Sequence, residues 1–251
     1  MIDILLTSFL FATVLLGIHS YYGIHIIRRG IIFTDLAIGQ MAALGTAIAF
    51  LFFEGRFHYP ISLSFALIGA FLIALTAKKK MSHEAFIGLI YALGISLSII
   101  VLSKNPHGTE EVQKLTAADI LFITRGELIK TSILYAIIGL FLFFVVEKIR
   151  GTLKEILFFT SFAITVTSSV NLAGVLVVFS ILVAPAYIMS FFFEKFSTRL
   201  ISAWIFGIII NVMAILISYF FDLPTGYTIV AFYALSGILV SLFCKCSKNG
   251  D

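Results

Sequence analysis

The sequence has few charged residues, few prolines and very little cysteine. Only 12% of its 251 residues are charged, whereas 61% are hydrophobic and the mean hydropathy is +1.12. A soluble globular domain is about 25% charged and about 45–50% apolar. The chain therefore lacks the polar surface that a soluble domain needs, and we expect it to reside in a lipid bilayer.

The sequence patterns of several enzyme classes are also missing. The chain has no G-x-x-x-x-G-K-[ST] phosphate loop, no H-E-x-x-H zinc motif and no G-x-S-x-G nucleophile elbow. We therefore expect no enzymatic activity and no ATP site of the phosphate-loop type in this chain. An intramembrane enzyme is the weakest hypothesis, because no nucleophile–base pair is visible. The two cysteines, Cys244 and Cys246, offer no disulfide framework and lack a third metal ligand.

Long apolar runs take up most of the chain. They do not alternate between apolar and polar residues as the strands of a membrane β-barrel do. Most are about 20 residues long, which is the length of a membrane-spanning helix. The runs are Ile4–Ile27, Ile31–Phe53, Ile61–Ala77, Ala85–Leu102, Leu128–Val146 and Ile156–Phe193, with two more that end at Phe221 and near Cys244.

The run Ile156–Phe193 is too long for a single span at 1.5 Å per residue. We divide it near Ser168–Asn171, which gives nine spans, or eight if one half is re-entrant. The sequence therefore predicts an all-α, polytopic integral membrane protein with about eight to nine transmembrane helices. We expect residues 1–251 to form a single transmembrane domain, with a first helix that is retained rather than cleaved.

Basic residues indicate the orientation of these spans. With nine spans, the clusters at 28–29, 78–80, 148–154, 195–199 and 245–248 fall on one side, which the positive-inside rule makes cytoplasmic. The net charge of +4 largely reflects these helix ends, so we do not expect nucleic acid as a partner. The N-terminus and the polar segment 103–119 then lie outside.

The stretch Phe33–Ala49 combines small residues with two polar groups, Asp35 and Gln40. Small residues allow membrane helices to approach closely. An ionisable group inside a span is costly and by default faces a cavity or a partner, so we take Asp35 as a candidate cation ligand. The alternative is a carboxylate at a helix start that pairs with Arg28 or Arg29. For Gln40, a hydrogen bond between helices is the alternative to a substrate contact.

Two further polar residues lie within apolar runs. His19 is deep in the first run, and a neutral imidazole is a common metal ligand, although a buried histidine with structural partners is the more frequent case. Asn171 lies at the expected break between the sixth and seventh spans. There it would either line a cavity from an unwound segment, as a candidate ligand on the metal path, or cap the next helix.

The segment 103–119 contains one imidazole and two carboxylates close together, in His107, Glu110 and Glu111. Nitrogen and oxygen ligands of this kind suit a divalent cation. A solvated acidic loop is the alternative interpretation. In the predicted orientation, this loop would also suit metal capture or the docking of a binding protein on the outside.

With these residues in view, the chain resembles the permease subunit of ABC transporters for zinc, manganese and related divalent metals. The basic pair, the aspartate and the small-residue helix of Arg28–Gly45 are similar to the family, as is the acidic-then-Ile-Gly helix of Glu84–Ser103. The most specific matches are VNLAGVLVVFSILVAPA at Val170–Ala186 and ISYFFDLPTGYTIV at Ile217–Val230. The likeness covers nearly the whole length in the same order.

The resemblance implies an ABC importer permease in a bacterial or archaeal cytoplasmic (inner) membrane. It implies a dimer of two permease chains around one path, a separate ATPase subunit on the cytoplasmic side and an external solute-binding protein. A divalent metal would be the substrate, with no cofactor bound by this chain. A stand-alone ion-coupled carrier or channel for a small cation is the alternative function.

Two departures from the family pattern stand out. The family usually has a histidine four residues after the aspartate, whereas this chain has Gly39 there, or Gln40 if the alignment is made on Gly45. Gln40 and His19 are the two candidates for the missing ligand. The cytoplasmic connector at 147–155 is also shorter than the family's, which uses that segment to contact the ATPase.

Overall fold

The computed structural model describes residues 2–76, 83–104 and 120–243, which are helical with short connections and contain no strand. Eight of the helices are long and apolar enough to cross a membrane, and α8 is a shorter apolar helix of 16 residues. The prediction of an all-α protein with eight to nine spans is confirmed. The helices are α1 (Ile2–Arg29), α2 (Thr34–Phe53), α3 (His58–Thr76), α4 (His83–Leu102), α6 (Arg125–Phe144), α7 (Thr152–Ala173), α8 (Val175–Ser190), α9 (Phe196–Phe221) and α10 (Thr225–Phe243), with short 3-10 helices η1 (Ile120–Phe122) and η2 (Val146–Lys148).

The division of the longest apolar run lies at a different residue from the one predicted. The helical conformation continues through Ser168–Asn171, and the break comes at Gly174, whose φ of 83° and ψ of 160° end α7. This positive φ is readily adopted only by glycine. The polar residues that suggested the break are instead inside α7, because serine and threonine side chains in apolar surroundings bond to the carbonyl one turn earlier, as Thr167 does to Ala163 at 2.7 Å.

The described residues divide into two compact units that alternate along the sequence. The first unit comprises residues 1–30, 119–128 and 176–251, and the second comprises residues 31–118 and 129–175. The expectation of a single domain over residues 1–251 stays a prediction.

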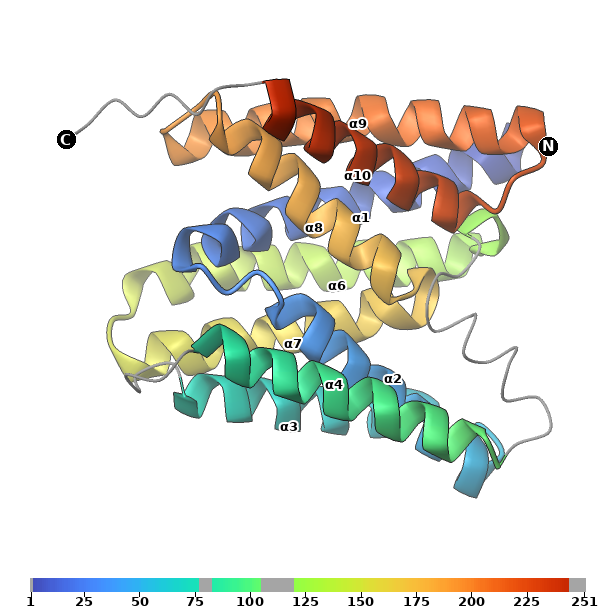
Figure 1. Ribbon diagram of the computed structural model, residues 1–251, viewed down its shortest axis with the longest axis vertical. Coiled ribbons are helices and arrows are strands. Elements are labelled where there is room, and N and C mark those ends of the chain that lie inside the picture. The colour runs from blue at the N-terminus through green and yellow to red at the C-terminus, as the bar shows by residue number, and fades with distance from the viewer. Residues whose placement is uncertain (1, 77–82, 105–119, 244–251) are drawn as a thin grey trace. The chain divides into compact units, whose positions relative to one another are not determined.

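The second unit is arranged around α2, with α3, α4 and α7 packed against it (Figure 1). Glycines allow this close packing. A Cβ atom added to Gly45 would lie 2.7 Å from the Ile61 carbonyl oxygen on α3, and one added to Gly94 on α4 would lie 3.0 Å from the Gln40 carbonyl carbon. These helices therefore meet almost backbone to backbone, as expected where small residues line a contact between membrane helices.

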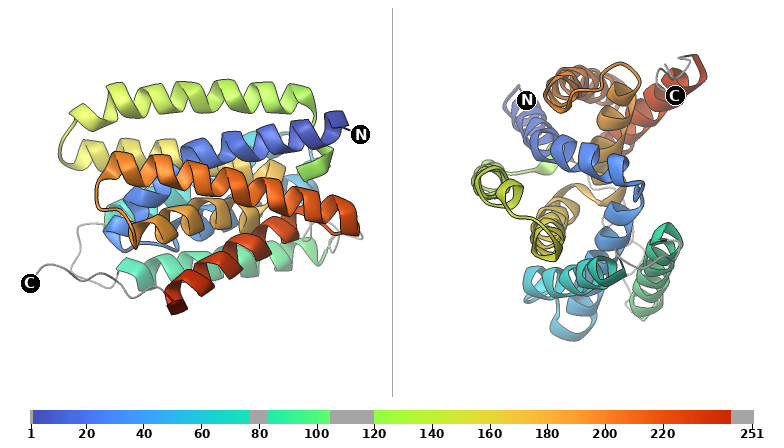
Figure 2. Two further views of the ribbon diagram at one scale, coloured as in Figure 1. Left: turned by 90° about the horizontal axis from the view of Figure 1, so that it is seen from above. Right: turned by 90° about the vertical axis from the view of Figure 1, so that its left-hand side faces the viewer.

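The first unit is arranged around α1. Figures 1 and 2 show α1 beside α9, and the Trp204 indole N–H donates to the Gly17 carbonyl oxygen at 3.0 Å. A Cβ atom on Gly23 of α1 would collide with the Leu182 carbonyl oxygen, so α8 also lies directly against α1. On α10, the Tyr233 hydroxyl donates to the Gly207 carbonyl oxygen of α9 at 3.0 Å. Helices α8, α9 and α10 are thus each fixed by a specific contact.

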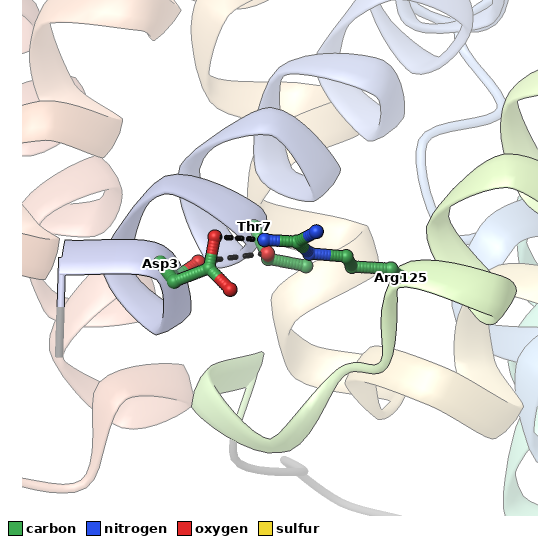
Figure 3. A network of polar contacts seen from close by, with 3 residues as sticks. All are labelled: Asp3, Thr7 and Arg125. Carbon is green, nitrogen blue, oxygen red and sulfur yellow. Dashed lines mark hydrogen bonds and ion pairs between the residues drawn. The ribbon is translucent and has the colours of Figure 1, made fainter.

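An ion pair joins the start of α1 to the start of α6 within the first unit. The Arg125 guanidinium binds the Asp3 carboxylate, while Thr7 donates to the Asp3 carbonyl oxygen at 2.8 Å (Figure 3). Both charged side chains are more than half exposed, at 69% and 62%. Exposed pairs contribute about 0–1 kcal/mol, so this contact has little effect on stability.

Candidate functional site

Asp35 is the most unusual polar residue of the second unit. It lies in the first turn of α2 and is 1% exposed. Neither of its carboxylate oxygens has a hydrogen-bond partner within the described part of the chain. Removing a carboxylate from water costs several kcal/mol unless a counter-charge or hydrogen bonds compensate. A carboxylate in this position therefore requires a proton or a cation.

Arg28 has other partners, and the alternative in which Arg28 or Arg29 pairs with Asp35 stays a prediction. The Arg28 guanidinium donates to the Glu194 carbonyl oxygen at 3.1 Å and lies over the Phe196 ring. These contacts are within the first unit. Among the residues that the structure describes, Asp35 is a buried carboxylate without a hydrogen-bond donor, which is the feature expected of an intramembrane cation ligand.

Glu84 is a functional candidate that the sequence analysis did not single out. From the first turn of α4, its Oε1 accepts the Phe33 N–H at 3.2 Å, while its Oε2 is buried and has no hydrogen-bond partner among the described residues. Phe33 precedes α2 and provides no side-chain cap of its own. Glu84 therefore caps the helix that carries Asp35 and brings a second carboxylate to its start. The available signals were an acidic residue at the beginning of an apolar run and its place at the start of the family-like stretch Glu84–Ser103.

Gln40 lies five residues beyond Asp35 on α2. At 3.6 residues per turn, their side chains point about 140° apart, so they do not share a helical face. Gln40 is half-buried, and its side chain makes no hydrogen bond within residues 2–76, 83–104 and 120–243. Its backbone is in close contact with α4 at Gly94. The alternative in which the Gln40 side chain forms a hydrogen bond to another helix therefore has no support. Its role as a metal ligand stays a prediction.

Asn171 occupies a different environment from the one expected. It neither caps α8 nor lies in an unwound segment, because it is inside α7 and three residues before the break. Its amide nitrogen donates to the Thr167 carbonyl oxygen at 2.8 Å and to the Ser62 hydroxyl at 3.2 Å, and its amide oxygen accepts from Thr46 at 3.1 Å. The Asn171 cluster, formed by these four residues, ties α7 to α2 and α3. These bonds give the side chain a structural role, and its role as a ligand stays a prediction.

His19 belongs to the first unit, where its ring is fully buried in α1. Its Nδ1 lies 2.8 Å from the Leu15 carbonyl oxygen. A carbonyl oxygen only accepts, so Nδ1 carries the proton in this bond and Nε2 is the basic nitrogen of the neutral ring. The role of His19 as a metal ligand stays a prediction.

The remaining predicted ligands, His107, Glu110 and Glu111, lie outside the described residues. Within the described residues, no three His, Cys, Asp or Glu side chains gather as a metal site would require. The site that the structure does define is the start of α2, where buried carboxylate oxygens of Asp35 and Glu84 lack donors. Further ligands for a cation would have to come from water, main chain or another molecule.

In the part of the chain that the structure describes, eight span-length helices and a buried, unpaired carboxylate at the start of a central helix define a multi-pass membrane protein with the features of a transporter. The ABC 3 transport family model matches residues 1–153 and 145–245. The chain therefore belongs to the ABC 3 transport family. This confirms the family that the four sequence stretches indicated.

The names of related proteins agree with membership of the ABC 3 transport family. A Haemophilus influenzae protein named "Probable iron transport system membrane protein" is 26% identical over 96% of this chain and 90% of its own length. The manganese transport system membrane protein MntB of Synechocystis is 25% identical over 74% of this chain and 66% of its own length. Among solved structures, PsaBC from Streptococcus pneumoniae in complex with Fab superposes with a TM-score of 0.79 at 18% identity, covering 98% of this chain and 93% of that one. The fold is thus that of an ABC transporter permease.

Proposed function

We propose that this chain is the permease subunit of an ATP-binding-cassette importer for divalent metal cations, with zinc, manganese or iron as the substrate. Membership of the ABC 3 transport family and the names of the relatives support this function. The structural observation that carries it is the Asp35 carboxylate, which is 1% exposed and finds no donor for either oxygen among residues 2–76, 83–104 and 120–243. A passing cation would supply the missing counter-charge.

The physical role of Asp35 follows from the cost of dehydrating a cation. A divalent metal leaves water only when several oxygen or nitrogen ligands replace its hydration shell. Asp35 supplies an anionic oxygen inside the membrane, and the free Oε2 of Glu84 is a second one beside the same helix start. Gln40 and His19 are the candidates for the ligand that the missing histidine leaves open.

The proposal includes the partners of such an importer. A separate ATPase subunit binds on the cytoplasmic side, an external solute-binding protein delivers the metal, and a second copy of this chain completes the path. The clusters of basic residues support a cytoplasmic position for the connector at 147–155. The protein resides in the cytoplasmic (inner) membrane and binds no cofactor of its own.

The test of the metal path is Asp35→Asn, which keeps the size of the side chain and removes its charge. Cells that depend on the transporter should lose at least ten-fold in uptake of the transported metal, measured across zinc, manganese and iron by mass spectrometry, at unchanged protein level. Asp3→Asn is the matched control, because it removes an exposed carboxylate from α1 and should leave uptake unchanged. Full uptake by Asp35→Asn would contradict the role of this carboxylate.

A second experiment separates the importer from a stand-alone carrier. The purified chain should co-elute with an ATPase that contains a phosphate loop, and reconstituted uptake should require ATP hydrolysis. Uptake by the chain alone, driven by an ion gradient without ATP, would establish the carrier instead.

A further inference from the structure

Two arginines of the first unit bind neighbouring carbonyl groups in the connection between α8 and α9. The Arg199 guanidinium donates from Nε and Nη2 to the Phe193 carbonyl oxygen at 3.0 and 2.8 Å. Arg28, in the last turn of α1, donates from Nη2 to the next carbonyl oxygen, that of Glu194, at 3.1 Å. Its Cζ lies 5.6 Å from the centre of the Phe196 ring, a cation–π contact that also fixes its position. The two guanidinium groups are therefore held near each other, and the charge of Arg28 acts on Arg199.

The charge of these two arginines is only partly neutralised. Neither Arg28 nor Arg199 forms an ion pair within the part of the chain that the structure describes. The Glu194 carboxylate offsets some of their charge, but Lys195 beside it is positive and exposed. A guanidinium has five N–H donors, and the carbonyl bonds occupy one donor of Arg28 and two of Arg199. The Arg28–Arg199 pair therefore offers donors and net positive charge to an anionic ligand.

The lengths of α1 and α9 place this pair at the depth of lipid headgroups. With 28 and 26 residues at about 1.5 Å each, the two helices are roughly 42 and 39 Å long. The hydrocarbon core of a bilayer is about 30 Å thick, so both helices extend beyond it. Arg28 lies in the last turn of α1 and Arg199 in the first turn of α9, which are the parts that reach the layer of lipid phosphates.

The face of α1 that carries Arg28 is open further into the membrane. Gly17 shares this face, since 11 residues at about 100° each bring the two side-chain directions within about 20°. A Cβ atom added to Gly17 would meet nothing within 4 Å. Trp204 flanks this space, because its indole N–H donates to the Gly17 carbonyl oxygen and its side chain is 38% exposed. A ligand held by Arg28 thus has room for an apolar chain that passes beside Trp204.

We propose that the Arg28–Arg199 pair binds the phosphodiester headgroup of an anionic phospholipid, whose acyl chain lies along α1 past Gly17. The planar guanidinium matches two phosphate oxygens at once. The net positive charge selects an anionic lipid over a zwitterionic one, and the predicted cytoplasmic leaflet is the one that carries anionic lipids. The open face of α1 favours a ligand with an apolar tail over an acidic protein segment. The site is independent of Asp35, which belongs to the second unit.

The test uses Trp204 as a reporter, because it is the one tryptophan of the chain. The purified chain is placed in phosphatidylcholine vesicles that contain a minor fraction of phosphatidylglycerol. Bromine atoms, which quench tryptophan fluorescence at close range, are carried on the acyl chains of one lipid or of the other. Quenching should show phosphatidylglycerol enriched beside Trp204 by at least about three-fold over its share of the vesicle, because each basic residue near the surface attracts anionic lipid.

Variants separate charge from structure. Arg28→Gln should reduce the enrichment to less than about half, whereas Arg28→Lys, which keeps the charge, should retain most of it. Lys195→Gln breaks no hydrogen bond of the described residues and should lower the enrichment in the same direction. Arg125→Gln is the matched control, because it also removes an exposed arginine from the first unit but at the start of α6, and it should leave the enrichment unchanged.

Four results would overturn the proposal. The first is quenching of the unmodified chain that equals the bulk share of phosphatidylglycerol. The second is enrichment that neither Arg28→Gln nor Lys195→Gln changes. The third is loss of the enrichment on adding inorganic phosphate at constant ionic strength, which would assign the site to free phosphate. The fourth is an Arg28→Gln variant that keeps the enrichment but no longer co-elutes with an ATPase, which would assign the arginines to a protein partner.

Discussion

The contact between α2 and α3 allows a sharp prediction, because it depends on the absence of one side chain. Gly45→Ala places a methyl group 2.7 Å from both the Ile61 carbonyl oxygen and the Ser62 Cα. These are backbone atoms and cannot rotate away, so α3 must move. Ser62 would move with it, and its hydroxyl donates to the Ala42 carbonyl oxygen at 2.9 Å.

The expected destabilisation combines three effects. Overpacking of a well-packed contact costs about 1–3 kcal/mol. Each hydrogen bond between membrane helices contributes about 0.6 kcal/mol, and the two bonds made by Ser62, to Ala42 and Asn171, are at risk. Alanine in place of glycine within a helix returns about 0.5–1 kcal/mol. The net expectation is a loss of roughly 1–3 kcal/mol in the free energy of unfolding.

Gly88→Ala on α4 is the matched control, because a Cβ atom there meets nothing within 4 Å. The free energy of unfolding can be measured by titrating a denaturing detergent into mixed micelles. Gly88→Ala should be neutral, or stabilising by up to about 1 kcal/mol. If Gly45→Ala were as stable as Gly88→Ala, the reasoning that backbone contact determines the position of α3 would be refuted.

Three further predictions concern single polar contacts. Asn171→Ala should lower the free energy of unfolding by about 1–2 kcal/mol in the same titration, because the Thr46 and Ser62 hydroxyls each lose one of their two hydrogen bonds. Glu84→Gln keeps an acceptor for the Phe33 N–H and removes the charge, so it should retain thermal stability and reduce metal uptake. Glu84→Ala should reduce both thermal stability and metal uptake. If Glu84→Gln took up as much metal as the unmodified chain, Glu84 would act only as a helix cap. Arg125→Ala should change the unfolding free energy by no more than about 1 kcal/mol, because its pair with Asp3 is exposed, and a larger loss measured by detergent titration would contradict that view.

Much of the fold could be predicted from the sequence because the bilayer imposes a local requirement. Apolar runs of about 20 residues correspond to helices whatever their neighbours are. The runs ending at Phe53, Leu102 and Phe221 end where α2, α4 and α9 end. The error at Ser168–Asn171 arose because polar residues suggested a break that the backbone makes only at Gly174.

The candidate site was less predictable, because hydrogen-bond partners come from other helices. Asp35 was correctly recognised as an unusual residue, but its lack of any donor depends on what packs around the start of α2. Asn171 seemed an equal candidate by composition, yet Thr46 and Ser62 occupy its amide group. Glu84 was overlooked because only the packing of α4 on α2 brings it to the Phe33 N–H.

The sequence by itself determined that this protein crosses a membrane many times and belongs to a transport family, since hydrophobic length and local motifs are properties of consecutive residues. Only the tertiary structure decided which polar side chains are satisfied and which remain without a partner. It also decided where glycines bring backbones into contact and where Arg28 and Arg199 bind neighbouring carbonyl groups. These features depend on distances between residues far apart in the chain, which the packing of the helices alone establishes.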